Sequence, residues 1–317
     1  MLDLLLAKDR VLRISLLTAL VFYGGVLATI VLSPDLVNIM GQHVGGDFMA
    51  FYAAGSAFWQ GDALASYDVA WFENQLQEIG PAVDYYGLTW QYPPTYFLFV
   101  APFALLPYKL ACLAWLGAGL GFFTWVLRQL PIRRFGLIIA LTSPFLLTAA
   151  MQGQNSFFFG GLLILAATLA GTRPVLAGVA AGLLTMKPQL GLLIPFAFAA
   201  AGCWRAFGTA AVTGLALAGI SLLIFGLDGW SAFADSLGRD HGDLEAGGVL
   251  YPYARMISLY SALGMLGVVA GDANRAQLIG GAATGTFHRA IPTSLSENST
   301  HYRGRSSKAT RRIGASR

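Results

Sequence analysis

The chain has 317 residues, of which 56% are hydrophobic and only 11% are charged, and its formal net charge is +4. Together with a mean hydropathy of +0.61, this composition excludes an ordinary soluble domain and indicates a polytopic membrane protein. Basic residues stand at the ends of apolar segments and in the C-terminal tail, which fits membrane topology better than nucleic-acid binding. Cys112 and Cys203 lie inside apolar runs, so they form no disulfide framework, metal motif or redox motif.

Apolar runs that suit membrane helices recur along most of the chain. A bilayer core about 30 Å thick takes roughly 20 apolar residues as a helix, and lipid offers no partners for backbone groups. We therefore expect an all-α protein with about eight or nine transmembrane or re-entrant helices. The candidate segments are Ile14–Leu32, Tyr92–Leu106, Leu110–Leu127, Phe135–Ala150, Phe157–Ala170, Pro174–Met186, Pro188–Ala201, Ala206–Leu227 and Ala254–Val269.

The first segment sets the orientation. Lys8, Arg10 and Arg13 precede it, which places the N-terminus in the cytoplasm by the positive-inside rule. Its apolar stretch is too long for a secretory signal, and no small-x-small cleavage site follows, so we expect a retained anchor in the inner (plasma) membrane.

The loop at 33–90 is then expected to face the periplasm or the exterior. No Lys or Arg occurs from Ile14 to Tyr108, whereas this loop contains seven acidic residues. Aromatic residues at helical spacing predict short helices that lie on the membrane.

Two topologies are open for the stretch that follows. If both Tyr92–Leu106 and Leu110–Leu127 cross fully, the arginines at 128, 133 and 134 lie outside, against the charge rule. If the proline-bounded part from 93 to 107 is re-entrant or peripheral, these arginines are cytoplasmic. The second topology is favoured, and it puts residues 151–155, Lys187 and the loop at 228–253 on the outer side with Asp47.

Asp47 follows two glycines close to the predicted membrane surface. A partly desolvated carboxylate there has a raised proton affinity and suits a general base. The alternative is a helix N-cap, because an amphipathic helix follows. Asp62 and Asp68 resemble turn residues.

Polar residues at three further places are candidates for binding. Lys187, with Gln189 beside it in "MKPQ", interrupts an apolar hairpin, so it holds a phosphate or snorkels to an interface. Gln154 and Asn155 in "MQGQN" bind sugar hydroxyls or form a polar turn. Arg255 in "YPYARM" is a second phosphate ligand or part of an aromatic belt.

No metal or nucleotide motif is present. His43 and His241 lie in outer loops without partners at zinc spacing, so no metal site is expected. P-loop, HExxH, GxSxG and dinucleotide fingerprints do not occur in the sequence.

An ordered set of motifs resembles glycosyltransferase family 87, the polyprenyl-phosphate-mannose-dependent α-1,2-mannosyltransferase-like integral membrane proteins. The motifs are "GGDF.AFYAAG....GDA...YD", "YPPTYFLFVAPFALLP", "GQNSFFFGGLLILAA" and "RPVLAGVAAGLLTMKPQLGLLIPFAF...WRAF", within Val11–Leu278. The resemblance implies the C-type glycosyltransferase fold, whose large first outer loop carries the catalytic aspartate.

The resemblance also implies a reaction. A hexosyl, and by family mannosyl, group moves with inversion from a polyprenyl-phosphate sugar to a hydroxyl of a glycan or glycolipid acceptor at the outer face. Asp47 would be the base, and Lys187 with Arg255 would stabilise the leaving phosphate. Gln154, Asn155, Gln189 and Tyr92 would bind sugar or acceptor, an apolar groove open to lipid would hold the polyprenyl tail, and no cofactor or metal would be required.

The composition changes near the C-terminus. Residues 1–283 form the expected membrane domain, and the Ser/Thr/Arg-rich segment at 284–317 predicts a basic, disordered tail, as a truncation or a shifted reading frame would produce. A different class of function also stays open, because a transporter or flippase of lipid-linked sugars would have polar groups at helix breaks, although we find no internal repeat.

Overall fold

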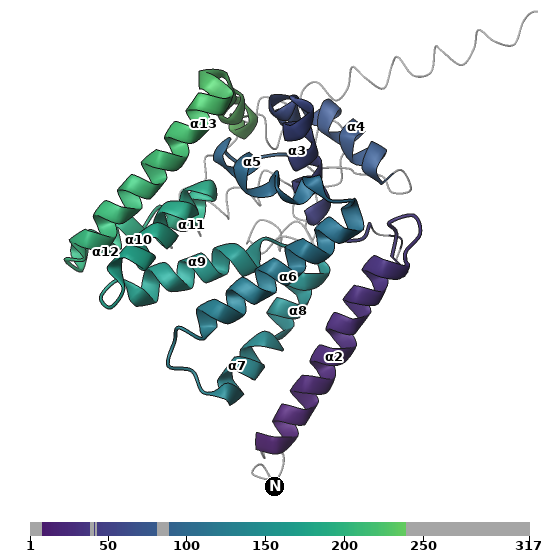
Figure 1. The fold of residues 1–317 in the computed structure, drawn as a ribbon, viewed down its shortest axis with the longest axis vertical. Coiled ribbons are helices and arrows are strands. Elements are labelled where there is room, and N and C mark those ends of the chain that lie inside the picture. Colours follow the sequence, from purple (N-terminus) through teal and green to yellow (C-terminus); the bar gives the residue numbers. More distant parts are fainter. Residues whose placement is uncertain (1–7, 39–40, 42, 81–88, 239–317) are drawn as a thin grey trace, which may run out of the picture. The chain divides into compact units, whose positions relative to one another are not determined.

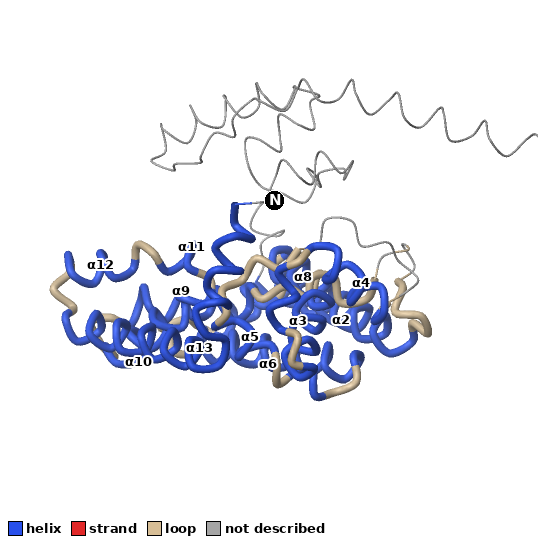
Figure 2. Tube along the Cα trace, turned by 90° about the horizontal axis from the view of Figure 1, so that it is seen from above, coloured by secondary structure: helices blue, strands red, loops and turns tan. Residues whose placement is uncertain are grey.

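The computed structural model describes residues 8–238, except 39–40, 42 and 81–88. The predicted Arg255 and the segment Ala254–Val269 lie outside the described residues. Within them, the all-α prediction is confirmed: the secondary structure consists of helices and one isolated β-bridge between Val37 and His43 (Figure 2). The helices are α2 (Lys8–Leu32), α3 (Phe48–Gln60), η1 (Ala63–Tyr67), α4 (Val69–Ile79), α5 (Thr95–Val100), η2 (Phe103–Leu105), α6 (Tyr108–Leu127), α7 (Arg134–Leu141), α8 (Pro144–Met151), α9 (Ser156–Leu169), α10 (Pro174–Leu183), η3 (Leu184–Met186), α11 (Pro188–Gly191), α12 (Ile194–Ala200) and α13 (Trp204–Gly238).

Three helices in the described residues are long and apolar enough to cross a membrane. They are Asp9–Leu32, Tyr108–Leu127 and Trp204–Leu237, and α7 with α8, bent by 43°, would make a fourth span. The helices α9, α10 and α13 lie side by side (Figure 2). The expected count of eight or nine crossings stays a prediction.

Helix α3 belongs to the core, and that the helices of the 33–90 loop lie on the membrane stays a prediction. Its residues Phe48, Met49, Phe51 and Ala54 are buried. The reason is the small-residue face of α3: a Cβ on Gly55 would lie 2.9 Å from the Cβ of Ala104, so the helix packs directly on the segment that carries α5 and η2.

The predicted segment Tyr92–Leu106 is divided into two short pieces, α5 and η2. A helix as short as α5, with six residues, spans about 9 Å, far less than a bilayer core of about 30 Å. Pro102 follows α5, and its missing N–H prevents the helix from continuing. Neither piece is long enough to cross a membrane.

The long helix α13 contains a break at Gly226. The backbone there has φ of 64° and ψ of −169°, a region that glycine adopts and other residues avoid. The apolar part before the break agrees with the predicted segment Ala206–Leu227.

Side-chain hydrogen bonds tie helix ends together at both ends of the bundle. Lys109 Nζ donates to the carbonyl oxygens of Val31 at 3.2 Å and Ser33 at 2.5 Å, so the end of α2 lies beside the start of α6. Arg173 Nη1 donates to Gln129 Oε1 at 2.6 Å, so the end of α9 lies beside the end of α6. Helices α3, α4 and α5 gather at the Lys109 end of α2 and α6 (Figure 1).

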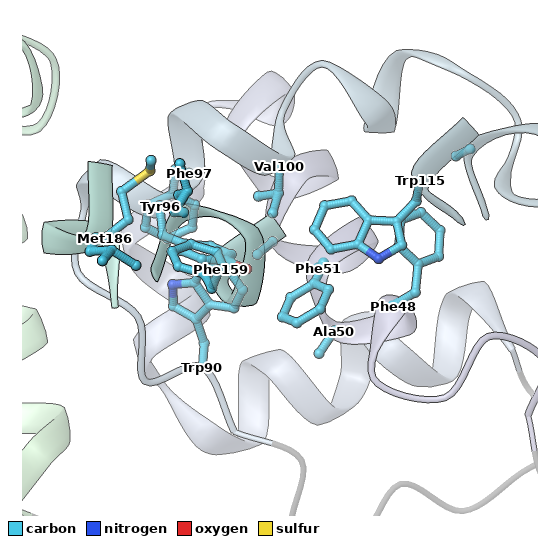
Figure 3. Close-up of a cluster of buried hydrophobic side chains, with 14 of the residues drawn as sticks. Phe48, Ala50, Phe51, Trp90, Tyr96, Phe97, Val100, Trp115, Phe159 and Met186 are labelled. Carbon is cyan, nitrogen blue, oxygen red and sulfur yellow. The ribbon is translucent and has the colours of Figure 1, made fainter. Parts of the chain in front are cut away.

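Buried aromatic rings from α3, α5, α6 and α9 form a core cluster (Figure 3). Trp115 from α6 packs against Phe48 and Phe51 of α3, with ring centroids 5.5 and 5.1 Å apart. Tyr96 from α5 stacks on Phe159 from α9 at 5.6 Å. This core fixes the turns before α3 and α9, where the polar residues lie.

Candidate active site

Two glycine-containing turns, at 45–47 and 152–154, pack against each other at the start of α3. Asp47 N–H donates to the carbonyl oxygen of Gln152 at 2.8 Å. A Cβ on Gly46 would lie 2.5 Å from that same oxygen, and a Cβ on Gly153 would lie 2.8 Å from Phe48 Cβ and still closer to Gly45 O. Both glycines have positive φ, 51° and 56°. Only residues without a side chain allow this approach, which brings "GGD" and "QGQN" into contact.

The Asp47 carboxylate points to the second turn. Asp47 is at the N-cap position of α3, but its side chain makes no capping hydrogen bond. Instead, Gln154 Nε2 donates to Asp47 Oδ2. The capping alternative therefore does not describe this residue, and the carboxylate is held by an amide from a distant part of the sequence. Asp68, by contrast, caps α4 by accepting from Trp71 N–H at 2.8 Å.

Asn155 is the buried centre of the polar network, with 0% of its surface exposed. Its Nδ2 donates to the hydroxyl oxygens of Tyr92 at 3.0 Å and Tyr96 at 2.7 Å. Its Oδ1 accepts from Lys187 Nζ at 3.0 Å. The amide thus joins α9, the segment before α5 and the break before α11 at one point.

Lys187 reaches this point from the break between η3 and α11. Its φ of −137° and ψ of 73° are non-helical, and Pro188 begins the next helix. The ammonium lies 5.8 Å from the ring centroid of Phe159, a cation–π contact. Burial lowers the pKa of Lys187, and the negative charge of Asp47 opposes this shift. Asp47 and Lys187 therefore interact electrostatically within one site.

Tyr92 lines the same site. Its ring stacks on Tyr96 with centroids 4.0 Å apart and contacts Phe51 at 5.7 Å. Burial raises the pKa of Tyr92 to about 12, the hydrogen bond from Asn155 lowers it, and the charge of Asp47 raises it. The phenol is therefore neutral at physiological pH and offers an O–H group.

The structure brings together five of the seven predicted site residues: Asp47, Tyr92, Gln154, Asn155 and Lys187. Gln189 is exposed and makes no side-chain hydrogen bond within the described residues. Arg255 lies outside them.

Sequence reasoning missed two members of the site, Tyr96 and Phe159. The spacing of Tyr96, four residues after Tyr92, would have placed both phenols on one face of a helical turn. Phe159 follows Asn155 by four residues and carries the same signal.

An apolar cavity of about 550 Å³ lies beside the break, between α10 and α13, and Pro188 and Thr185 contribute to its wall. Most of the other lining residues are small or apolar, among them Gly182 and Gly214. No group of three or more His, Cys, Asp or Glu side chains that would hold a metal ion occurs among the described residues.

Comparison with known protein families matches the chain to glycosyltransferase family 87 over residues 90–300. The match covers about two thirds of the chain and includes Tyr92, Gln154, Asn155 and Lys187, whereas Asp47 precedes it. Neither the curated proteins nor the solved structures compared contain a match to the chain. Since a family model matches well over half of the residues, this helical membrane protein belongs to glycosyltransferase family 87 and is a glycosyltransferase.

Proposed function

We propose that the protein transfers a hexosyl group, specifically mannosyl, from a polyprenyl-phosphate sugar to a hydroxyl of a glycan or glycolipid at the outer face of the membrane. One observation carries the proposal. A carboxylate, Asp47, and an ammonium, Lys187, converge on the adjacent amides of Gln154 and Asn155 at a helix break in an otherwise apolar core.

The two charges suit the two ends of a displacement at the anomeric carbon. The acceptor oxygen forms a bond to that carbon while Asp47 takes its proton, and the bond from carbon to phosphate oxygen breaks with its electron pair going to the phosphate. Lys187 stabilises the negative charge that develops on the leaving phosphate. Attack from the face opposite the phosphate inverts the anomeric configuration.

The remaining predicted ligands divide into two groups. Tyr92 is partly exposed and neutral, and we assign its hydroxyl to the donor head group. Gln154 orients the Asp47 carboxylate. Asn155 is fully buried and bonded on both sides of its amide, so we assign it to holding the site rather than to touching sugar. Gln189 and Arg255 remain candidates for the sugar and the phosphate.

The donor is an amphiphile, and the surroundings of Lys187 suit one. The 550 Å³ cavity at Pro188 has apolar walls next to the cationic break. Thr185 and Pro188, on either side of Lys187 in the sequence, line the cavity, so we propose that the first part of the polyprenyl chain enters it while the phosphate contacts Lys187. The cavity is within the range of about 300–1,000 Å³ that is typical of ligand sites.

The orientation follows from the charges at the helix ends. Arg128, Arg133, Arg134 and Arg173 lie at or near the end where α6 and α9 are tied by the Gln129 hydrogen bond. The positive-inside rule makes this end cytoplasmic and the Asp47 end outer. We include the C-type glycosyltransferase fold, with eight or nine crossings in the inner membrane, in the proposal.

The test is sugar transfer by the purified full chain with labelled polyprenyl-phosphate sugars and envelope acceptors. Asp47→Asn should lower the turnover rate by at least 100-fold, because general-base catalysis contributes about 10² to 10⁴. Asp62→Asn is the matched control, since Asp62 is exposed and lies in the same loop, and it should leave turnover within twofold. Equal rates for wild type and Asp47→Asn would refute the role of Asp47, and absence of transfer by wild type would refute the proposed reaction.

A further inference from the structure

The partners of the Asn155 side chain determine which group donates and which accepts in each of its three hydrogen bonds. A lysine ammonium has donors and no acceptor, so the atom that faces Lys187 Nζ at 3.0 Å must be the oxygen Oδ1. The amide nitrogen therefore faces the two phenols, at 3.0 Å from Tyr92 and 2.7 Å from Tyr96. Each phenol oxygen accepts an N–H, and its own proton must be donated elsewhere.

The two phenols differ in where that proton can go. Tyr96 is 0% exposed and is enclosed by the rings of Tyr92 and Phe159. Tyr92 is partly exposed and feels the charge of Asp47. Neither phenol donates a hydrogen bond to another side chain or backbone oxygen within the described residues. Of the two phenols, Tyr92 is therefore the one whose proton a bound ligand can accept.

We infer that Asn155 is a positioning residue that makes Tyr92 a hydrogen-bond donor to an oxygen of the donor head group, while the same amide holds Lys187 beside that head group. This inference rests on the proposed function, because it assumes that a phosphate sugar occupies the site. The Asn155 amide nitrogen can only donate to Tyr92, and its oxygen can only accept from Lys187. A group that accepts from Tyr92 instead of donating to it would turn the Tyr92 proton away from the substrate.

Asn155→Asp makes this change with almost no change in size. The carboxylate accepts from both phenols and from Lys187, so Tyr92 donates inward and the lysine charge is compensated. Asn74→Asp, at an exposed position on α4, introduces the same charge as a matched control and should alter binding by less than twofold.

The experiment is a double-mutant cycle on equilibrium binding of two probes to the purified full chain: polyprenyl phosphate and polyprenyl-phosphate mannose. In the wild-type background, Tyr92→Phe should weaken binding about tenfold, as expected for loss of a hydrogen bond to a charged or polar oxygen. In the Asn155→Asp background, Tyr92→Phe should change binding by less than twofold. An effect on both probes assigns the acceptor to the phosphate, and an effect on the sugar-bearing probe alone assigns it to the sugar.

Equal factors for Tyr92→Phe in the two backgrounds would overturn the inference, and so would a wild-type factor below twofold with both probes. If Asn155→Asp does not accumulate as folded protein, Asn155→Ser replaces it, because the shorter hydroxyl no longer directs both phenols; the Tyr92→Phe factor must then shrink at least threefold. Transfer activity is measured separately. Wild type that binds the probes without transferring sugar refutes the proposed reaction, and the binding cycle still decides the role of Asn155.

Discussion

The contact between the two glycine turns can be tested by adding one methyl group to it. Gly153 has φ of 56°, and a Cβ there would lie 2.8 Å from Phe48 Cβ and closer still to Gly45 O. Gly153→Ala must therefore push apart the segments that hold Asp47 and Gln154. Gly202→Ala is the matched control, because Gly202 has φ of 68° and nothing lies within 4 Å of its Cβ position.

The expected magnitudes follow from these two environments. A left-handed backbone costs an alanine roughly 1–2 kcal/mol, and this is the whole penalty at Gly202. At Gly153, overpacking adds about 1–3 kcal/mol and loss of the Asp47 N–H bond to Gln152 adds about 1 kcal/mol. The total is about 3–6 kcal/mol. At roughly 3 °C per kcal/mol, the expected decrease in Tm is about 3–6 °C for Gly202→Ala and about 9–18 °C for Gly153→Ala.

Thermal unfolding of both variants in the same detergent, followed by circular dichroism, measures the difference. Sugar transfer at a temperature where both are folded gives a second comparison: Gly153→Ala should lose it and Gly202→Ala should keep it. Equal decreases in Tm would refute the close contact between the turns. Full activity of Gly153→Ala would show that this contact does not position Asp47.

Two further predictions concern the lysine and the helix break. Because burial lowers the pKa of Lys187 below its ordinary value of 10.5, its proton is lost at lower pH than that of an exposed lysine, and binding of polyprenyl phosphate should fall as pH rises through this lowered pKa. Lys187→Arg should keep binding polyprenyl phosphate at higher pH than wild type. Asp47→Asn removes the charge that opposes the shift in the Lys187 pKa, so its loss of binding should occur at still lower pH. The binding constant is measured as a function of pH for each variant, and identical curves for wild type and Asp47→Asn would contradict the interaction between Asp47 and Lys187. Gly226→Ala should lower the free energy of unfolding by about 1–3 kcal/mol, because the φ and ψ of the break suit glycine alone. Gly219→Ala is the control, in the straight part of α13 with open space around it, and it should change the free energy of unfolding by less than 1 kcal/mol. Equal effects of the two substitutions would contradict a fixed break at Gly226.

The sequence was sufficient to predict the helical class, because a segment in lipid must satisfy its own backbone hydrogen bonds and long apolar runs indicate such segments. It was less informative on where the runs break. Tyr92–Leu106 is one apolar run, and its prolines favoured a re-entrant or peripheral course for 93–107, but only the structure shows the division into α5 and η2. The aromatic spacing of α3 predicted a helix there, but its burial in the core depends on Gly55, which permits close packing.

The site shows the same division between what local sequence contains and what only folding supplies. Asp47 and Lys187 could be proposed as site residues from the sequence, since an isolated charge in an apolar context needs a partner. Their connection through Asn155 could not, because it depends on Tyr92, Tyr96 and the lysine meeting at one amide from three segments.

That connection explains why a glycosyltransferase would place its polar residues at turns and not on membrane helices. A helix offers side chains at fixed positions but keeps its own backbone groups bonded, whereas the turns at Gly46 and Gly153 bring two backbones into direct contact and set Asp47 against Gln154. The aromatic core then excludes water from the inner side, so the Asn155 amide is satisfied by protein groups alone. Charges held in this way need no reorganisation when a substrate arrives, which is the condition under which one carboxylate and one ammonium contribute most to a transfer reaction.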